Sequence, residues 1–226
     1  LNLDLRTGIK LVESDEAFLN RELLGRIRVS PDVEKLIFIG LTNRTNTGAL
    51  ATAIGRAPTE QPITRHIQPI KAIARSLMEA CGMQASTPLT FLKDRIEIGS
   101  GINLVKETIG PNPDNPAEWL DALQLFLDKG LPPQRTVFVP TFRDPIDIVA
   151  SWRRMWGFTM DNFPFDSFNR SFLKVDETIT KAHALGIRVV PYVHEFLRDF
   201  DRFKIMEKMF GHLGLPFSQD VVHWND

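Results

Sequence analysis

Short apolar runs alternate along this chain with longer segments in which apolar residues recur at helical spacing. The apolar runs are rich in isoleucine, valine, leucine and phenylalanine, as buried strands are, and lie at 36–39, 102–105, 137–139 and 187–193. The segments typical of helices begin at Ser14, near residue 47 and at Asp144, and also cover 63–81, 117–127, 168–184 and 200–210. Strands that alternate with helices form a parallel sheet covered on both faces, so the pattern predicts a three-layer α/β fold with a central parallel sheet.

Proline and glycine residues mark the expected interruptions in this pattern. Pro69 lies inside the helical segment 63–81 and predicts a kink or a break there. Residues 110–116 are Gly, Pro, Asn and Asp and are expected to form a loop. The chain of 226 residues has the length of one α/β domain, so we expect a single domain over 1–226 in which residues 1–34 are an N-terminal lead.

The segment after the first predicted strand has the layout of an anion-binding loop. Gly40 ends the apolar run, polar residues follow, and Gly48 leads into a helix of small residues. In such a strand–turn–helix unit, the backbone N–H groups at the helix start and the helix dipole attract an anion. Arg44 adds a positive charge, and the hydroxyl groups of Thr45 and Thr47 add hydrogen-bond donors. An ordinary polar surface turn is the alternative interpretation.

The segment after the third predicted strand contains a second candidate anion site. Asp144 and Pro145 are residue types of a helix N-cap and a first helical position, and Asp147 suits the dipole of the first turn. Ser151 follows Asp144 by about 700° of helical rotation and ~10 Å along the axis, so the two side chains point in similar directions. Arg143 precedes the cap, and an arginine and a hydroxyl group so placed can hold one phosphate between them.

Charge and composition argue against several classes of function. The net charge is −1 at pH 7, so no basic field favours nucleic acid or an anionic membrane. No apolar run approaches the roughly 18 residues of a membrane span. The five histidines stand singly, so we expect no metal site, and the single cysteine, Cys81, cannot form an internal disulfide. This cysteine usage and the lack of a recognisable signal peptide favour a cytoplasmic location.

Three motifs together resemble the sulfotransferase family, which uses 3′-phosphoadenosine 5′-phosphosulfate (PAPS). The segment RDPIDIVAS at 143–151 resembles the 3′-phosphate motif of that family, and RTNTG at 44–48 resembles its 5′-phosphosulfate loop. The C-terminal segment 193–216 resembles the ending of the same family. The resemblance covers a core over 36–217 in the expected order, and it implies a P-loop NTPase-like fold.

The resemblance also implies roles for particular residues. PAPS, which leaves as 3′-phosphoadenosine 5′-phosphate (PAP), would be bound by Arg44, Thr45, Asn46, Thr47, Gly48, Arg143 and Ser151. By the same resemblance, Lys106 would stabilise the leaving group and Glu107 would act as general base, with no metal involved. Consecutive strand residues point to opposite faces, so only one of the pair faces a ligand crevice unless the strand has ended. A surface Lys–Glu pair is the alternative interpretation, and His66 is either a rival base or a partly buried helix residue.

The expected acceptor is a small molecule, carbohydrate or lipid that offers a hydroxyl group or an amine. Aromatic residues crowd 152–172 and could form a lid over an apolar acceptor or pack as ordinary core. Arg153 and Arg154 are expected on a solvated face.

Two alternatives to a sulfotransferase follow from the same segments. A P-loop kinase of small molecules would need a Walker lysine and an acidic residue for Mg²⁺ at the end of strand 137–139, and the sequence has neither. A sulfotransferase-like binding module without catalytic activity is suggested by Asn46, which stands where the family has glycine.

Overall fold

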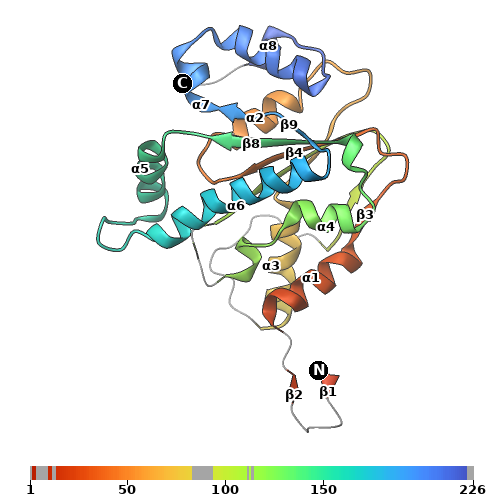
Figure 1. Ribbon diagram of the computed structural model, residues 1–226, viewed down its shortest axis with the longest axis vertical. Helices are drawn as coiled ribbons and strands as arrows, with labels where there is room; N and C mark the ends of the chain where they lie inside the picture. Colours follow the sequence, from red (N-terminus) through yellow and green to blue (C-terminus); the bar gives the residue numbers. More distant parts are fainter. Residues whose placement is uncertain are drawn as a thin grey trace.

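A parallel sheet between two layers of helices forms the body of the protein (Figure 1). The computed structural model describes residues 2–3, 10–11, 14–82, 94–110, 112 and 115–222. The strands of the main sheet are β4 (Lys35–Leu41), β5 (Thr64–Ile67), β7 (Ile102–Thr108), β8 (Thr136–Phe142), β9 (Arg188–Val189) and β10 (Tyr192–Val193). Their order is β10-β8-β4-β7-β5, with β9 also beside β8, and all these pairs are parallel.

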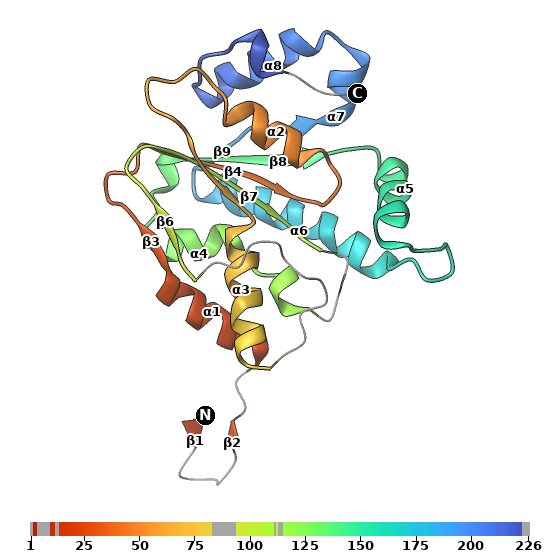
Figure 2. The same cartoon turned by 180° about the vertical axis from the view of Figure 1, so that it is seen from behind.

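Helices cover both faces of this sheet, as Figures 1 and 2 show from opposite sides. One face carries α2 (Thr47–Ile54), α7 (His194–Asp199) and α8 (Arg202–Leu213). The other carries α1 (Asp15–Arg26), α3 (Pro69–Ala80), α4 (Ala122–Asp128) and α6 (Phe165–Ala184), while α5 (Pro145–Trp156) lies beside the end of β8. The predicted three-layer α/β fold with a central parallel sheet is therefore confirmed.

Short elements complete the described chain. Two pairs of strands lie outside the main sheet, namely β1 (Asn2–Leu3) with β2 (Lys10–Leu11), which is antiparallel, and β3 (Ile27–Val29) with β6 (Ile96–Ile98), which is parallel. Single 3-10 turns are η1 (Pro116–Glu118), η2 (Pro133–Arg135) and η3 (Gln219–Val221). The segments 83–93 and 223–226, and part of the expected loop 110–116, lie outside the described residues.

Successive residues of the central strands supply two separate cores. Phe38 of β4 packs in the cluster shared with α1, α3, α4 and α6, and its neighbour Ile39 packs in the cluster shared with α2 and α8. In β7, Leu104 belongs to the α2 and α8 side and Val105 to the opposite side. Both faces of these strands are buried, which explains why the strands consist of consecutive apolar residues.

Two of the predicted helices are wrong in detail. Residues 64–67, expected to begin a helix, form β5, because they pair with β7 at the sheet edge. Pro69 then starts α3, so the expected interruption is a complete break. The helix expected over 117–127 divides into η1 and α4, since Asp121 accepts a hydrogen bond from the Gln124 N–H at 3.0 Å and caps α4.

Two C-terminal elements also divide. The strand expected over 187–193 becomes β9 and β10, with Pro191, which has no N–H to donate, between them. The last helix, expected over 200–210, is preceded by α7, and Asp201 caps α8 by accepting from the N–H groups of Phe203 and Lys204.

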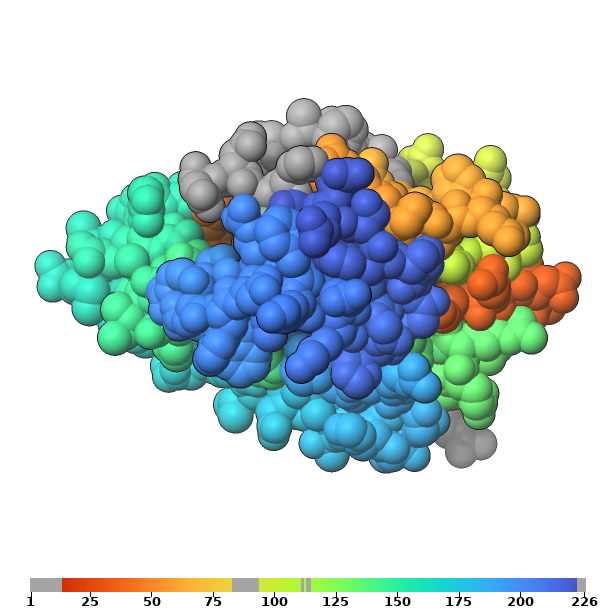
Figure 3. Space-filling view, turned by 90° about the horizontal axis from the view of Figure 1, so that it is seen from above, coloured from red at the N-terminus to blue at the C-terminus, as the bar shows by residue number. Residues whose placement is uncertain are grey.

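The aromatic residues of 152–172 pack between α5 and the start of α6. Trp152, Phe163 and Phe168 are buried, and the ring of Trp152 lies 5.2 Å from Trp156 and 5.5 Å from Phe168, both edge-on. These are the contacts of a small separate core. Figure 3 shows this part of the chain, in green to teal, projecting at the left beside the blue C-terminal helices.

Candidate functional site

The loop between β4 and α2 follows a strongly bent backbone path. Gly40, Leu41, Arg44 and Asn46 have positive φ values of 122°, 90°, 66° and 64°. A Cβ atom at Gly40 would lie 2.1 Å from the carbonyl oxygen of Glu107 on the neighbouring strand, so only glycine allows this approach of β4 to β7. Asn46 is among the residue types that tolerate the left-handed conformation, and the turn forms without glycine at this position.

Internal hydrogen bonds hold the loop against the sheet. The hydroxyl of Thr45 donates to the carbonyl of Thr42 at 2.8 Å and lies 2.6 Å from the hydroxyl of Thr141 on β8. Thr45 is fully buried and therefore fixes the loop rather than facing solvent. Thr47 and Gly48 begin α2, and Asn46 at its N-cap makes no side-chain hydrogen bond to the helix. The first N–H groups of α2 thus lack a side-chain cap among the described residues, as an anion site requires.

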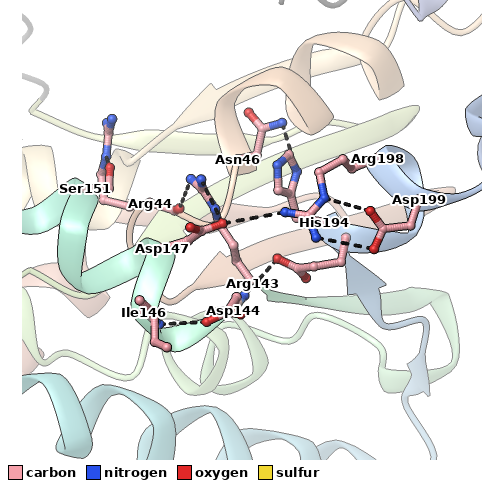
Figure 4. Close-up of polar contacts among 11 residues, drawn as sticks. Arg44, Asn46, Arg143, Asp144, Ile146, Asp147, Ser151, His194, Arg198 and Asp199 are labelled. Carbon is pink, nitrogen blue, oxygen red and sulfur yellow. Dashed lines mark hydrogen bonds and ion pairs between the residues drawn. The ribbon is translucent and has the colours of Figure 1, made fainter.

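The start of α5 lies directly against this loop. Arg44 Nε donates to Ser151 Oγ at 2.8 Å, and Arg143 Nη1 donates to the carbonyl of Arg44 at 3.3 Å. Asp144 caps α5 by accepting from the Ile146 N–H at 2.8 Å, as its sequence position predicts. Figure 4 shows Arg44, Arg143 and Ser151 close together between the loop and α5.

These residues surround an open cavity of about 370 Å³. Its lining consists of Arg44, Arg143, Ser151, Arg154 and Met155, and none of these five residues carries a carboxylate. We call it the arginine cavity. The chemistry of its walls, guanidinium groups and a hydroxyl, is that of a site for a phosphate or sulfate group.

The start of α7 borders the loop from the other side. His194 Nδ1 lies 3.4 Å from Asn46 Nδ2, and Glu195 Oε1 accepts from the Asp144 N–H at 2.8 Å. Partial burial and the positive charge of Arg143 lower the pKa of His194, which favours the neutral imidazole. A neutral Nδ1 accepts from the Asn46 amide, so β10 and α7 support the left-handed turn of the loop (Figure 4).

Lys106 and Glu107 point to opposite faces of β7, because the strand continues to Thr108. Lys106 lies two residues after Leu104 and therefore on the same side of β7, the side that α2 covers. Burial and the positive charges of Lys71 and Arg44 lower the pKa of Lys106, and the negative charge of Glu107 partly offsets this. Glu107 lies on the α3 side and is buried there.

The Glu107 carboxylate is bound to the start of α3. Its Oε1 accepts from the Ile70 N–H at 2.6 Å. Glu107 thus caps the start of α3, since the N-cap residue Gln68 makes no side-chain hydrogen bond to this helix. Burial raises the pKa of Glu107 to about 7, against the lowering effect of this hydrogen bond and of the Lys71 charge.

A buried ionic cluster lies beside Glu107. Glu118 of η1 pairs with both Lys71 and Arg75 of α3, and all three side chains are almost completely buried. This cluster joins η1 to α3. His66, the alternative base, is also buried, but it lies in strand β5 instead of a helix, and its Nε2 is 3.4 Å from Asn103 Oδ1.

Most of the predicted site residues therefore meet at one edge of the sheet. Arg44, Arg143 and Ser151 come together in the arginine cavity. Arg154, expected on a solvated face, also lines this cavity, and its spacing of three residues from Ser151 places the two on one helix face. His194 was not predicted as a site residue, and it has no local signal, since 148 positions separate it from Asn46.

The described residues contain neither a candidate metal cluster nor a candidate membrane-spanning helix. No group of three or more His, Cys, Asp or Glu side chains that could hold a metal ion occurs among them. Within the same described ranges, no helix is long and apolar enough to cross a membrane.

The fold and the site define an α/β protein with a candidate anion site at the carboxyl edge of its parallel sheet. No protein-family model matches the sequence, and no curated protein matches it. Among solved structures, the chain is similar to mouse sulfotransferase SULT7A1 complexed with PAP, with 15% sequence identity and a TM-score of 0.45. The similarity covers 89% of this chain and 65% of that protein, so the chain spans slightly less than two thirds of the length of that protein.

Proposed function

We propose that this protein is a sulfotransferase that moves a sulfuryl group from PAPS to a hydroxyl or amine acceptor. The observation that carries the proposal is the contact between Arg44 and Ser151. These residues belong to two motifs that resemble sulfotransferase motifs, lie 107 positions apart, and meet at 2.8 Å. Arg143 completes the same cavity.

The proposed cofactor site combines the arginine cavity with the start of α2. Arg143 and Ser151 would hold the 3′-phosphate of PAPS, with Arg44 beside them. The backbone N–H groups from Asn46 to Gly48, which no side chain of the described residues caps, would face the 5′-phosphosulfate at the positive end of the helix dipole. Thr45 would contribute by holding the loop in shape.

In the proposed reaction, an acceptor oxygen or nitrogen attacks sulfur in line while the bond from sulfur to the bridging phosphate oxygen breaks. The acceptor proton passes to a base, and PAP leaves with the added negative charge on its 5′-phosphate. We assign charge stabilisation to Lys106, because it shares the α2 side of β7 with the loop. Glu107, the predicted base, lies on the opposite face of β7, and its carboxylate accepts from the Ile70 N–H, so it would reach an acceptor only by leaving this hydrogen bond.

A thermal-shift experiment tests the proposal. Adenosine 3′,5′-bisphosphate (PAP) at 100 times its dissociation constant should stabilise the protein by about 2.7 kcal/mol, with or without EDTA. Arg143→Ala should weaken PAP binding by roughly 10- to 100-fold, because a charge-assisted hydrogen bond is worth about 1.5–3 kcal/mol. The same variant should bind adenosine 5′-phosphosulfate, which lacks the 3′-phosphate, almost as the parent protein does.

The same experiment separates the alternatives. Stabilisation by ATP with Mg²⁺ in place of PAP would favour a kinase, and equal loss of both ligands in Arg143→Ala would contradict the 3′-phosphate assignment. Binding of PAP without sulfate transfer to any of a broad set of hydroxyl and amine acceptors would favour the binding module. The proposed acceptor is a small molecule, carbohydrate or lipid that offers a hydroxyl group or an amine, and the proposed location is the cytoplasm.

A further inference from the structure

Arg154 lines the arginine cavity from the last turn of α5. It lies three residues after Ser151, and helical side chains lean toward the N-terminus, so its guanidinium extends back over the turn that carries Ser151. Among the described residues, no carboxylate lies within ion-pair distance of Arg154. The acidic side chain of α5, Asp147, belongs to the first turn of the helix and lies 3.5 Å from Arg143 and 3.9 Å from Arg198.

The adjacent arginine lies outside the cavity. Arg153 Nε donates to the carbonyl of Phe158 at 3.4 Å, beyond the end of α5, and Arg153 does not line the cavity. Arg153 and Arg154 therefore have the same charge, the same helix turn and similar exposure, and they differ in the direction of the side chain. This pair is a matched comparison for any effect of charge alone.

We propose that Arg154 is a third anion-binding residue of the arginine cavity and that, with Arg44 and Arg143, it selects a phosphate monoester. Such a group carries about −1.5 to −2 charges near pH 7 and three acceptor oxygens, which three guanidinium groups can share. Gathering three like charges around one cavity costs energy that a bound dianion offsets. The inference rests on the proposed function, because the 3′-phosphate of PAPS is a group of this kind.

The test compares the parent protein with Arg154→Ala, Arg154→Lys and Arg153→Ala. Isothermal titration would measure binding of PAP, of adenosine 5′-monophosphate and of inorganic phosphate, after circular dichroism has confirmed that each variant is folded. Arg154→Ala should weaken PAP binding about tenfold and change binding of the monophosphate less than about twofold. Arg153→Ala should leave both affinities within about twofold, and Arg154→Lys should recover part of the loss, since lysine keeps the charge without the planar fork.

Three results would overturn the role of Arg154. These are unchanged PAP binding in Arg154→Ala, equal losses in Arg154→Ala and Arg153→Ala, and equal losses for PAP and the monophosphate. If the parent protein binds PAP no better than the monophosphate, the proposed function fails, and the titration with inorganic phosphate then tests Arg154 by itself. Phosphate binding that is lost in Arg154→Ala and kept in Arg153→Ala would support Arg154 as a phosphate-binding residue of a protein with another function. If the parent protein binds no phosphate, the role of Arg154 is rejected.

Discussion

The buried carboxylate of Glu107 should make the stability of this protein depend on pH. The pKa of this group rises from 4.5 to about 7 on folding, so between these values the folded chain holds a proton that the unfolded chain releases. The free energy of unfolding therefore falls as pH rises through this window. Glu107→Gln keeps an oxygen that can accept from the Ile70 N–H and removes the charge, so its stability should lack this dependence.

The expected magnitude follows from the size of the pKa change. A rise of the pKa from 4.5 to about 7 corresponds to about 3 kcal/mol in full, and most of this falls between pH 5 and pH 8. The free energy of unfolding of Glu107→Gln, minus that of the parent protein, should therefore be roughly 2–3 kcal/mol more positive at pH 8 than at pH 5. Effects of the amide that do not depend on pH cancel in this comparison.

Urea unfolding followed by tryptophan fluorescence at the two pH values measures this difference. Glu97→Gln, which removes an exposed carboxylate from β6, is the matched control and should show a difference below about 0.5 kcal/mol. A difference for Glu107→Gln as small as that of the control would refute the reasoning, because the carboxylate would then ionise without a cost of burial.

The same variant tests the catalytic assignment. Loss of a general base lowers turnover by about 10²–10⁴-fold, so Glu107→Gln should lose most sulfate transfer and keep the thermal shift with PAP. Full turnover in this variant would show that Glu107 only holds the start of α3, and His66 would become the first candidate for the base.

Two further substitutions test the structure around the site by urea unfolding. Glu118→Gln leaves the charges of Lys71 and Arg75 buried without a full counter-charge and should cost about 3–5 kcal/mol. Glu22→Gln, in a half-exposed pair on α1, should cost less than about 1 kcal/mol, and similar losses in the two variants would contradict a structural role for the cluster. Asn46→Ala should be about 1–2 kcal/mol less stable than Asn46→Gly, because the backbone at this position is left-handed; equal stability would show that the loop changes its path.

Local signals predicted the elements that depend on neighbouring residues. Ser14 accepts from the Ala17 N–H and starts α1, and Asp144 with Pro145 starts α5, as their residue types indicate. The apolar runs at 36–39, 102–105 and 137–139 became the inner strands β4, β7 and β8, since a strand buried on both faces has no polar side. The polar turn after β4 likewise indicated a loop before a helix of small residues, and the loop lies there.

Contacts between distant segments decided the rest. Residues 64–67 have helical spacing, yet pairing with β7 makes them a strand, and backbone hydrogen bonds to a sheet edge outweigh weak local propensity. The sequence alone placed Arg44 and Ser151 in two candidate anion-binding segments. Only the pairing of β8 with β4 in the sheet brings α5 against the loop, so that Arg44 and Ser151 meet. The direction of Glu107 followed from the length of β7, because each added strand residue reverses the face to which the next side chain points.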